Sequence, residues 1–380
     1  MVEINANKLN WLLEKSYETK IPLDIKGPPG IGKSEIIKDT MVKIAEQNKL
    51  KFVDWNRLSA ENKENVLKED ITKQFIFADI RLSQMDQTDL KGFPNAQKEW
   101  ARWIPMLLFK VLSQPEAKGC VFFDEINLAT PSVVASCYQI INDHQIGETP
   151  ISKNILFVSA GNRLSDTNNA FEDPAPLNNR RGNMVLNPPI VRSSDPKEKT
   201  WTTWAIEHNI DSRIIAYLNC YETDIFRFEE DNKDPSFPTP RTWAKLSKMI
   251  ANLTNPKEIK LCAAIMIGEG TALKFYTYIK MAEKINVKEI LNNPELIKKY
   301  DKPEDIDKKY SIISTVSEMY VKDKKVLDKA LALCNYIEPE YGMFMLRMMK
   351  SFCKGNFGTE LNNTKNWQTI SEKYFKFLFN

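Results

Sequence analysis

The segment Gly27-Pro28-Pro29-Gly30-Ile31-Gly32-Lys33-Ser34 carries the strongest fold signal in this sequence. It fits the pattern G-x-x-x-x-G-K-[ST], in which glycines let backbone N–H groups curl around phosphate oxygens at the start of a helix. Residues 21–25 read as a short strand before it, and residues 34–48 carry apolar side chains at helical spacing after it. A glycine-rich turn without a ligand would not require that order of elements. We therefore predict a phosphate-binding loop, with Lys33 reaching the β and γ phosphates of a nucleotide and Ser34 ligating Mg²⁺.

Three further apolar runs predict buried parallel strands. They are FIFADI at 75–80, CVFF at 120–123 and ILFVSA at 155–160. Between the last two, Thr130 as N-cap and Pro131 at the first helical position open a helix with the sequence SVVASCYQIIND. Strands that alternate with helices predict an α/β sandwich built on a mainly parallel sheet.

The sequence changes character near Asn187, where two prolines follow and strand-like runs cease. Helix starts are expected instead at Asp195-Pro196, Asp211-Ser212 and Thr239-Pro240, because a capping residue precedes each first turn. We therefore expect an all-helical second region. The expected domains are an α/β nucleotide-binding domain over 1–190, a helical domain over 191–290 and a C-terminal helical extension over 291–380.

Two carboxylates and an amide follow the predicted strands. Asp124 and Glu125 close the CVFF run, at the strand end where open α/β sheets bind ligands. We expect Asp124 to orient Mg²⁺ through its water and Glu125 to polarise the attacking water. Asn162 ends the next strand, where it could hold that water from the opposite side. An acidic pair is also an ordinary turn or cap, and Gly-Asn an ordinary turn, so the phosphate loop is what favours the catalytic interpretation.

Three arginines are candidates for a phosphate contact. Arg180 and Arg181 set two like charges side by side, which is costly in a packed environment unless an anion lies near. Arg241 falls in the first turn of a predicted helix, where the helix dipole disfavours a cation by roughly several tenths of a kcal/mol. A nearby phosphate would reverse that sign. A solvated arginine is the alternative at each position.

The order of these motifs resembles the MoxR branch of the AAA+ ATPases, and in particular its compact members from bacteria and their phages. The matching segments, over about residues 20–250, are GPPGIGKS, RLSQMDQTDLKGFP, VFFDEIN, SAGN, NNRR and PTPRTW. The resemblance assigns Lys33 and Ser34 to Walker A, and Asp124 and Glu125 to Walker B. It implies an AAA+ P-loop core followed by an all-helical lid, with ATP and Mg²⁺ as ligands.

By the same resemblance, Asn162 matches sensor 1, Arg241 matches sensor 2, and Arg180 matches the arginine finger that a neighbouring subunit inserts. The family also implies an insert near residues 93–105 and a hairpin near residues 144–154, both facing the pore of a ring. The implied function is a hexameric ATPase that remodels or matures a protein partner. A protein with a von Willebrand factor A domain is the candidate partner.

The chain departs from the family pattern in two places. The family has an aromatic residue after the finger, whereas here Arg181 follows Arg180, so both arginines remain candidates. Residues 49–73 are also longer than expected between the first helix and the second strand, and we assign them no function.

Two other functions stay open. A DNA-translocating or restriction-type motor similar to McrB would need basic residues on the pore inserts, where Lys98 and Arg102 are candidates offset by Glu99. A nucleotide-gated scaffold with little turnover is the non-enzymatic alternative. The intact acidic pair at 124–125 argues against the scaffold.

The amino-acid composition limits the classes of binding partner and indicates the cellular compartment. Lys plus Arg (53) nearly balance Asp plus Glu (50), so the net charge of +3 creates no global field for nucleic acid or an anionic membrane. Six scattered cysteines without a C-x-x-C pair, and only two histidines, disfavour a zinc site and favour reduced thiols. No leader pattern and no run of ~18 apolar residues are present. We expect a soluble, cytoplasmic protein, in the host cytoplasm if a phage encodes it.

Overall fold

The computed structural model describes residues 1–96, 102–163, 178–193, 198–228, 235–353 and 355–379. Two compact units divide the chain, Met1–Pro188 and Pro189–Asn380. The boundaries expected at 190/191 and 290/291 remain predictions. The helix start expected at Asp195-Pro196, together with Lys98 and Glu99 of the first insert, lies outside the described residues.

A seven-stranded parallel sheet forms the centre of the first unit, in the order β1-β11-β2-β10-β7-β4-β3. Its strands are β1 Val2–Ile4, β2 Leu23–Lys26, β3 Lys51–Asp54, β4 Gln74–Arg81, β7 Lys118–Asp124, β10 Ile155–Gly161 and β11 Gly182–Leu186. The three apolar runs of the sequence form β4, β7 and β10, all buried. Because β10 lies between β2 and β7, the ends of these three strands meet at one edge of the sheet.

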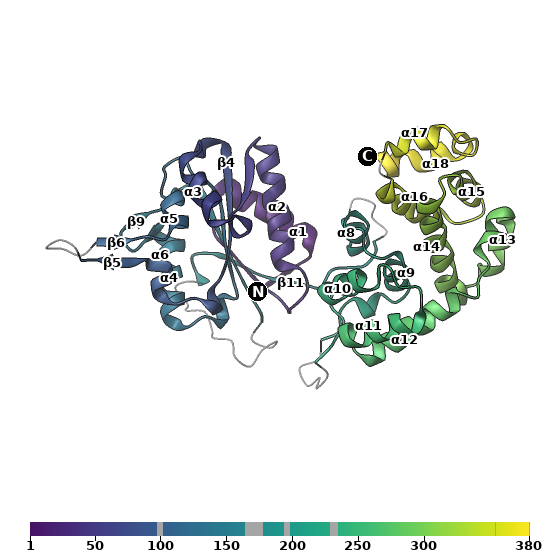
Figure 1. The fold of residues 1–380 in the computed structure, drawn as a ribbon, viewed down its shortest axis with the longest axis horizontal. Helices are drawn as coiled ribbons and strands as arrows, with labels where there is room; N and C mark the ends of the chain where they lie inside the picture. The colour runs from purple at the N-terminus through teal and green to yellow at the C-terminus, as the bar shows by residue number, and fades with distance from the viewer. Residues whose placement is uncertain (97–101, 164–177, 194–197, 229–234, 354, 380) are drawn as a thin grey trace. The chain divides into compact units, whose positions relative to one another are not determined.

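Helices cover both faces of this sheet (Figure 1). They are α1 Ala6–Thr19, α2 Lys33–Gln47, α3 Ala60–Lys68, α4 Gln87–Lys91, α5 Leu107–Leu112 and α6 Pro131–Asp143. One apolar cluster joins Ile76, Val121 and Phe157 of the sheet to side chains of α3, α5 and α6. α1 and α2 lie on the other side (Figure 1). The predicted fold class, a P-loop α/β core with a parallel sheet between helices, is confirmed.

Residues 49–73, to which the sequence assigned no function, add an edge strand to the sheet. β3 pairs parallel to β4, and α3 follows it, flanked by the short 3₁₀ turns Trp55–Arg57 and Ile71–Lys73. Phe52 stacks beside Phe75 and Phe77 of β4. The extra length therefore extends the sheet and its core.

Both expected inserts are antiparallel hairpins. The first consists of β5 Phe93–Asn95 and β6 Arg102–Ile104, and the second of β8 Gln145–Ile146 and β9 Thr149–Pro150. Phe93 and Ile104 are cross-strand partners, and their side chains are 62% and 53% exposed. The first hairpin therefore presents apolar side chains to solvent.

The second unit contains helices, and no strand among its described residues. Its helices are α8 Trp201–Glu207, α9 Ser212–Cys220, α10 Pro240–Ile250, α11 Pro256–Ile267, α12 Glu269–Ala282, α13 Val287–Asn292, α14 Ile306–Lys322, α15 Val326–Leu333, α16 Pro339–Phe352, α17 Phe357–Asn362 and α18 Trp367–Phe379. Asp211 and Thr239 cap α9 and α10 as expected. One continuous apolar cluster extends from Val191 to Tyr374. Among the described residues, no helix is both long enough and apolar enough to cross a membrane.

Candidate nucleotide site

The phosphate loop connects β2 to α2. Gly30 and Gly32 have φ angles of 79° and 96°, and Gly32 is the N-cap of α2. Only glycine adopts this left-handed backbone without strain. At Gly27, an added Cβ would lie 2.7 Å from the carbonyl oxygen of Leu186. Within the loop, Pro29 is half-buried. Four other loop residues are buried: Gly27, Pro28, Gly30 and Ile31.

Lys33 begins α2, and its side chain turns back over the loop. Its Nζ donates to the carbonyl oxygens of Gly27 and Pro28 at 2.7 and 3.0 Å, and to Asn162 Oδ1 at 3.3 Å. A buried ammonium ringed by acceptors is a strong charge-assisted donor. The structure thus brings together Lys33, at the start of α2, and Asn162, just after β10, although they lie far apart in the sequence.

Ser34 and Asp124 also meet at this edge. Ser34 Oγ donates to Asp124 Oδ2 at 3.1 Å. A hydroxyl and a carboxylate are hard oxygen ligands of the kind that Mg²⁺ prefers. These two residues therefore fit the expected metal role.

Glu125 follows Asp124 with a left-handed backbone, φ 57°. Its N–H donates to Asp124 Oδ1 at 3.0 Å, and its Oε2 accepts from the hydroxyl of Ser83. Ser83 lies in the 3₁₀ turn Leu82–Gln84 at the end of β4. A non-glycine residue in this conformation is uncommon and costs about 1 kcal/mol or more. Here the left-handed backbone of Glu125 directs the two adjacent carboxylates to different partners, Asp124 to Ser34 and Glu125 to Ser83.

Asn127, two residues after the acidic pair, forms a hydrogen bond with the backbone of Asn162. Its Nδ2 donates to the backbone oxygen of Asn162 at 2.7 Å, and the residue is only 2% exposed. A Cβ at Gly161 would lie 2.3 Å from Asn127 Oδ1. Gly161 is therefore the residue that leaves room for Asn127.

Asp79 adds a further carboxylate, on β4. Burial, and then the charge of Asp124, raise the pKa of Asp79 to about 6, while Arg81 and Lys38 oppose the shift. Its backbone N–H donates to Asn56 Oδ1 at 2.8 Å, and Asn56 Nδ2 donates to its carbonyl oxygen at 2.7 Å. The site edge thus concentrates negative charge, as a divalent cation would require.

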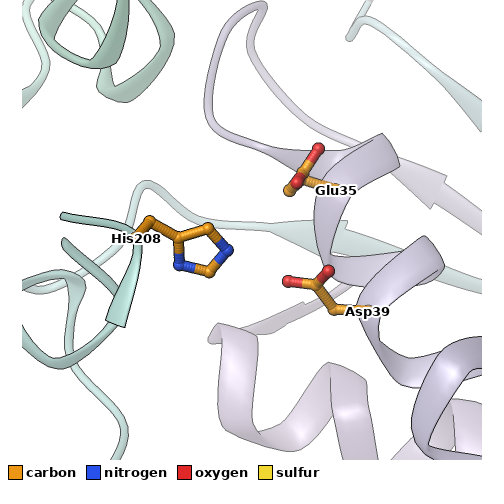
Figure 2. A group of neighbouring side chains, drawn as sticks. All are labelled: Glu35, Asp39 and His208. Carbon is orange, nitrogen blue, oxygen red and sulfur yellow. The ribbon is translucent and has the colours of Figure 1, made fainter. Parts of the chain in front are cut away.

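Figure 2 shows another acidic pair, Glu35 and Asp39, projecting from α2 one turn apart. Glu35 is exposed and lies in the first turn, where the helix dipole favours an anion. His208, also drawn, belongs to the second unit. Two carboxylates at this spacing are common on helix surfaces, and we assign no site to them.

The structure separates the two candidate finger arginines. Arg180 is exposed, and its guanidinium lies 4.9 Å from the ring centroid of Tyr138 on α6. The Arg181 side chain is fully buried and forms an ion pair with Asp24 at 3.2 Å. The charge of Arg181 is therefore held inside its own unit, and the assignment of a finger role to either arginine remains a prediction.

Arg241 lies in the second unit, in the first turn of α10, and is exposed. A reciprocal capping box between Thr239 and Thr242 fixes the start of this helix. Trp243 is fully buried and donates from Nε1 to the carbonyl oxygen of Asp224 at 2.8 Å. The helix that carries Arg241 is thus firmly placed within its own unit, and the role of Arg241 at a nucleotide remains a proposal.

Four residues of this region were missed by sequence reasoning: Asp24, Asp79, Ser83 and Asn127. Asn127 follows the acidic pair by two residues, within VFFDEIN, and this proximity was the available signal. Ser83 lies within the matching segment RLSQMDQTDLKGFP, but nothing there distinguishes it from its neighbours, and Asp24 carries no local pattern. Only strand pairing brings them to the site.

The first unit has the fold and the site of a P-loop NTPase. The KAP family P-loop domain matches residues 3–106, which include the phosphate loop but cover less than half of the chain. The comparison with curated proteins finds no match. The chain is thus similar to the KAP family in its N-terminal part.

Several solved structures resemble the chain, with low sequence identity and low TM-scores. A RuvB mutant from Thermotoga maritima is 17% identical with a TM-score of 0.34, and the match covers 71% of this chain and 66% of that one. PCH-2 of C. elegans is 12% identical with a TM-score of 0.29, covering 83% and 68%. ORC2 of Aeropyrum pernix is 12% identical with a TM-score of 0.35, covering 97% and 94%. The strand order and the phosphate loop carry the fold assignment without them.

Proposed function

We propose that this chain is a ring-forming AAA+ ATPase that hydrolyses ATP with Mg²⁺ and uses the energy to remodel or mature a protein partner. One observation carries the proposal: Lys33 contacts Asn162, and Ser34 contacts Asp124, at a single edge of the sheet. These contacts bring the four side chains to one place, and phosphoryl transfer depends mainly on such positioning and on charge stabilisation.

Each residue has a distinct task in this proposal. The loop amides and Lys33 bind the phosphates, while Ser34 and Asp124 would hold Mg²⁺, which neutralises phosphate charge when bound. Glu125 accepts a proton from the water that attacks the γ-phosphorus. ADP leaves as the phosphorus–oxygen bond breaks, and inorganic phosphate is released.

Two loss-of-function variants test the site. Lys33→Ala should abolish ATP binding, because it removes the charge that meets the phosphates. Glu125→Gln should keep ATP binding but lose turnover, because the carboxylate acts on water and not on the ligand. Isothermal titration measures binding and phosphate release measures turnover. Unchanged ATP affinity in Lys33→Ala would refute the site.

The exposure of Arg180 supports the proposed assembly. Its exposed guanidinium is available to a neighbouring copy, and an arginine finger supplied in trans contributes ~10³ to 10⁵ in rate. We propose a homo-oligomer, hexameric by the family resemblance, in which Arg180 acts on the neighbour's nucleotide. Specific activity should then rise with protein concentration. Arg241 is proposed to contact the γ-phosphate within the same chain.

A protein partner fits the first hairpin better than DNA does. The exposed cross-strand pair Phe93 and Ile104 is apolar, whereas Arg102 is the one cation among the described residues 93–96 and 102–105. A partner with a von Willebrand factor A domain is the candidate from the resemblance. Affinity capture with Glu125→Gln in ATP tests this, and DNA-stimulated ATPase activity with a steep salt dependence would favour a DNA motor instead.

A further inference from the structure

A buried polar cluster of Asp24, Ser159 and Arg181 lies behind the phosphate loop. β2 runs between β10 and β11, so Asp24 has Ser159 as its partner on one side, and Gly182, next to Arg181, pairs with Leu23 on the other. All three side chains of the cluster are at most 5% exposed. The cluster thus joins three strands on one face of the sheet.

The contacts within the cluster are short and directional. Ser159 Oγ donates to Asp24 Oδ1 at 2.5 Å, and Arg181 Nη1 donates to Ser159 Oγ at 3.0 Å while lying 3.2 Å from Asp24 Oδ1. Lys26 Nζ approaches Asp24 Oδ2 at 3.4 Å. Desolvating such charges is expensive, and apolar side chains of similar volume often give equal or greater stability. Stability alone therefore does not account for the cluster, whereas a need for fixed geometry does.

The geometry that the cluster fixes is that of residues 178–183. Arg181 Nη2 donates to Asn178 Oδ1 at 3.0 Å, and Asn183 Nδ2 donates to the carbonyl oxygen of Arg181 at 3.0 Å. Arg180 lies inside this tied segment and is itself exposed. Since Arg181 cannot move without breaking a buried ion pair, the backbone that carries Arg180 is held in place.

We propose that Arg181 is a positioning residue: anchored on Asp24 and Ser159, it fixes the segment that presents Arg180 to the nucleotide of a neighbouring copy. This inference rests on the proposed function. The residues that anchor Arg181 also lie close to the chain's own nucleotide site. Asp24 precedes the phosphate loop by three residues, and Ser159 precedes Asn162 by three residues.

Mixed oligomers of two inactive chains test the inference. The finger donor is Lys33→Ala, which has Arg180 but no working pocket, and the acceptor is Arg180→Ala, which has a pocket but no finger. Asp24→Leu with Arg181→Met replaces the buried pair by apolar side chains and is placed on the donor only or on the acceptor only. Gel filtration verifies mixing, and thermal unfolding verifies folding.

The two placements should differ. On the donor, the replacement should lower the regained ATPase activity by about 10- to 100-fold, the effect of a misplacement of about 1 Å at a reacting centre. On the acceptor, the loss should be clearly smaller, since that chain supplies no finger and only its pocket, three residues beyond the cluster, could be affected. A merely structural role would give equal losses on both sides, and that result, or no loss on the donor side, would overturn the inference.

Two controls separate other causes. If the unreplaced donor and acceptor form mixed oligomers without regaining activity, the proposed trans finger fails, and the fault does not lie with Arg181. If the double replacement does not fold, Ser159→Ala removes one link of the cluster without removing a charge. It should show the same donor-side bias at smaller amplitude, and equal effects on both sides would again refute the positioning role.

Discussion

Replacing Gly161 by alanine should disturb the site mainly through Asn127, with Lys26 Nζ, 3.3 Å from the new Cβ, as the next atom it meets. The new Cβ would lie 2.3 Å from Asn127 Oδ1 and 2.8 Å from its Cγ. Ordinary carbon contacts are about 3.5–4.0 Å, so Asn127 must move by about 1 Å. Because its Cγ is also too close, rotation of the amide cannot relieve the clash.

The size of the effect follows from what Asn127 does. It is buried, and its Nδ2 donates to the carbonyl oxygen of Asn162 at 2.7 Å. Overpacking costs about 1–3 kcal/mol, and loss of this hydrogen bond adds about 0.5–1.5 kcal/mol. We therefore expect Gly161→Ala to lower the free energy of unfolding of the first unit by about 2–4 kcal/mol.

A double-mutant cycle in urea unfolding isolates the clash. Asn127→Ala alone should cost only the hydrogen bond, and Gly161→Ala with Asn127→Ala should cost much less than the sum of the two single variants. Strict additivity of the two site substitutions would show that Asn127 is not what Gly161 accommodates.

Three further predictions concern ionisation and the acidic pair. Asp79 has a folded pKa raised to about 6 by burial, so its protonated form favours the folded state. The free energy of unfolding should then fall by about 1–2 kcal/mol as pH rises from about 4 to 6, and pH-dependent urea titrations of Asp79→Asn should lose this slope. Ser83→Ala should alter ATP turnover with little change in ATP affinity, because Ser83 contacts Glu125 and not the phosphate loop; a selective loss of affinity in titration calorimetry would contradict this. Burial lowers the pKa of Lys20 to about 8, so about half of its amine is neutral at pH 8. Mass spectrometry after brief acylation at that pH should find Lys20 among the first lysines modified, and a late position would refute the shift.

The phosphate loop, and the strand and helix that flank it, could be predicted from the amino-acid sequence. This was possible because the loop's chemistry is local. Gly30 and Gly32 occupy the left-handed backbone positions, and Lys33 and Ser34 follow within the first turn of α2. The apolar runs likewise predicted β4, β7 and β10, because buried parallel strands carry apolar side chains on both faces.

Other features depended on strand order and register, which no local pattern encodes. The adjacent arginines look alike in sequence, yet pairing of β11 beside β2 brings Arg181 to the buried carboxylate of Asp24 and leaves Arg180 exposed. In the same way, the pairing of β4 with β7 brings Ser83, at the end of β4, to Glu125 at the end of β7. A side chain's partner across a sheet is chosen by segments distant in the chain, so the tertiary structure alone could distinguish an anchored arginine from an available one.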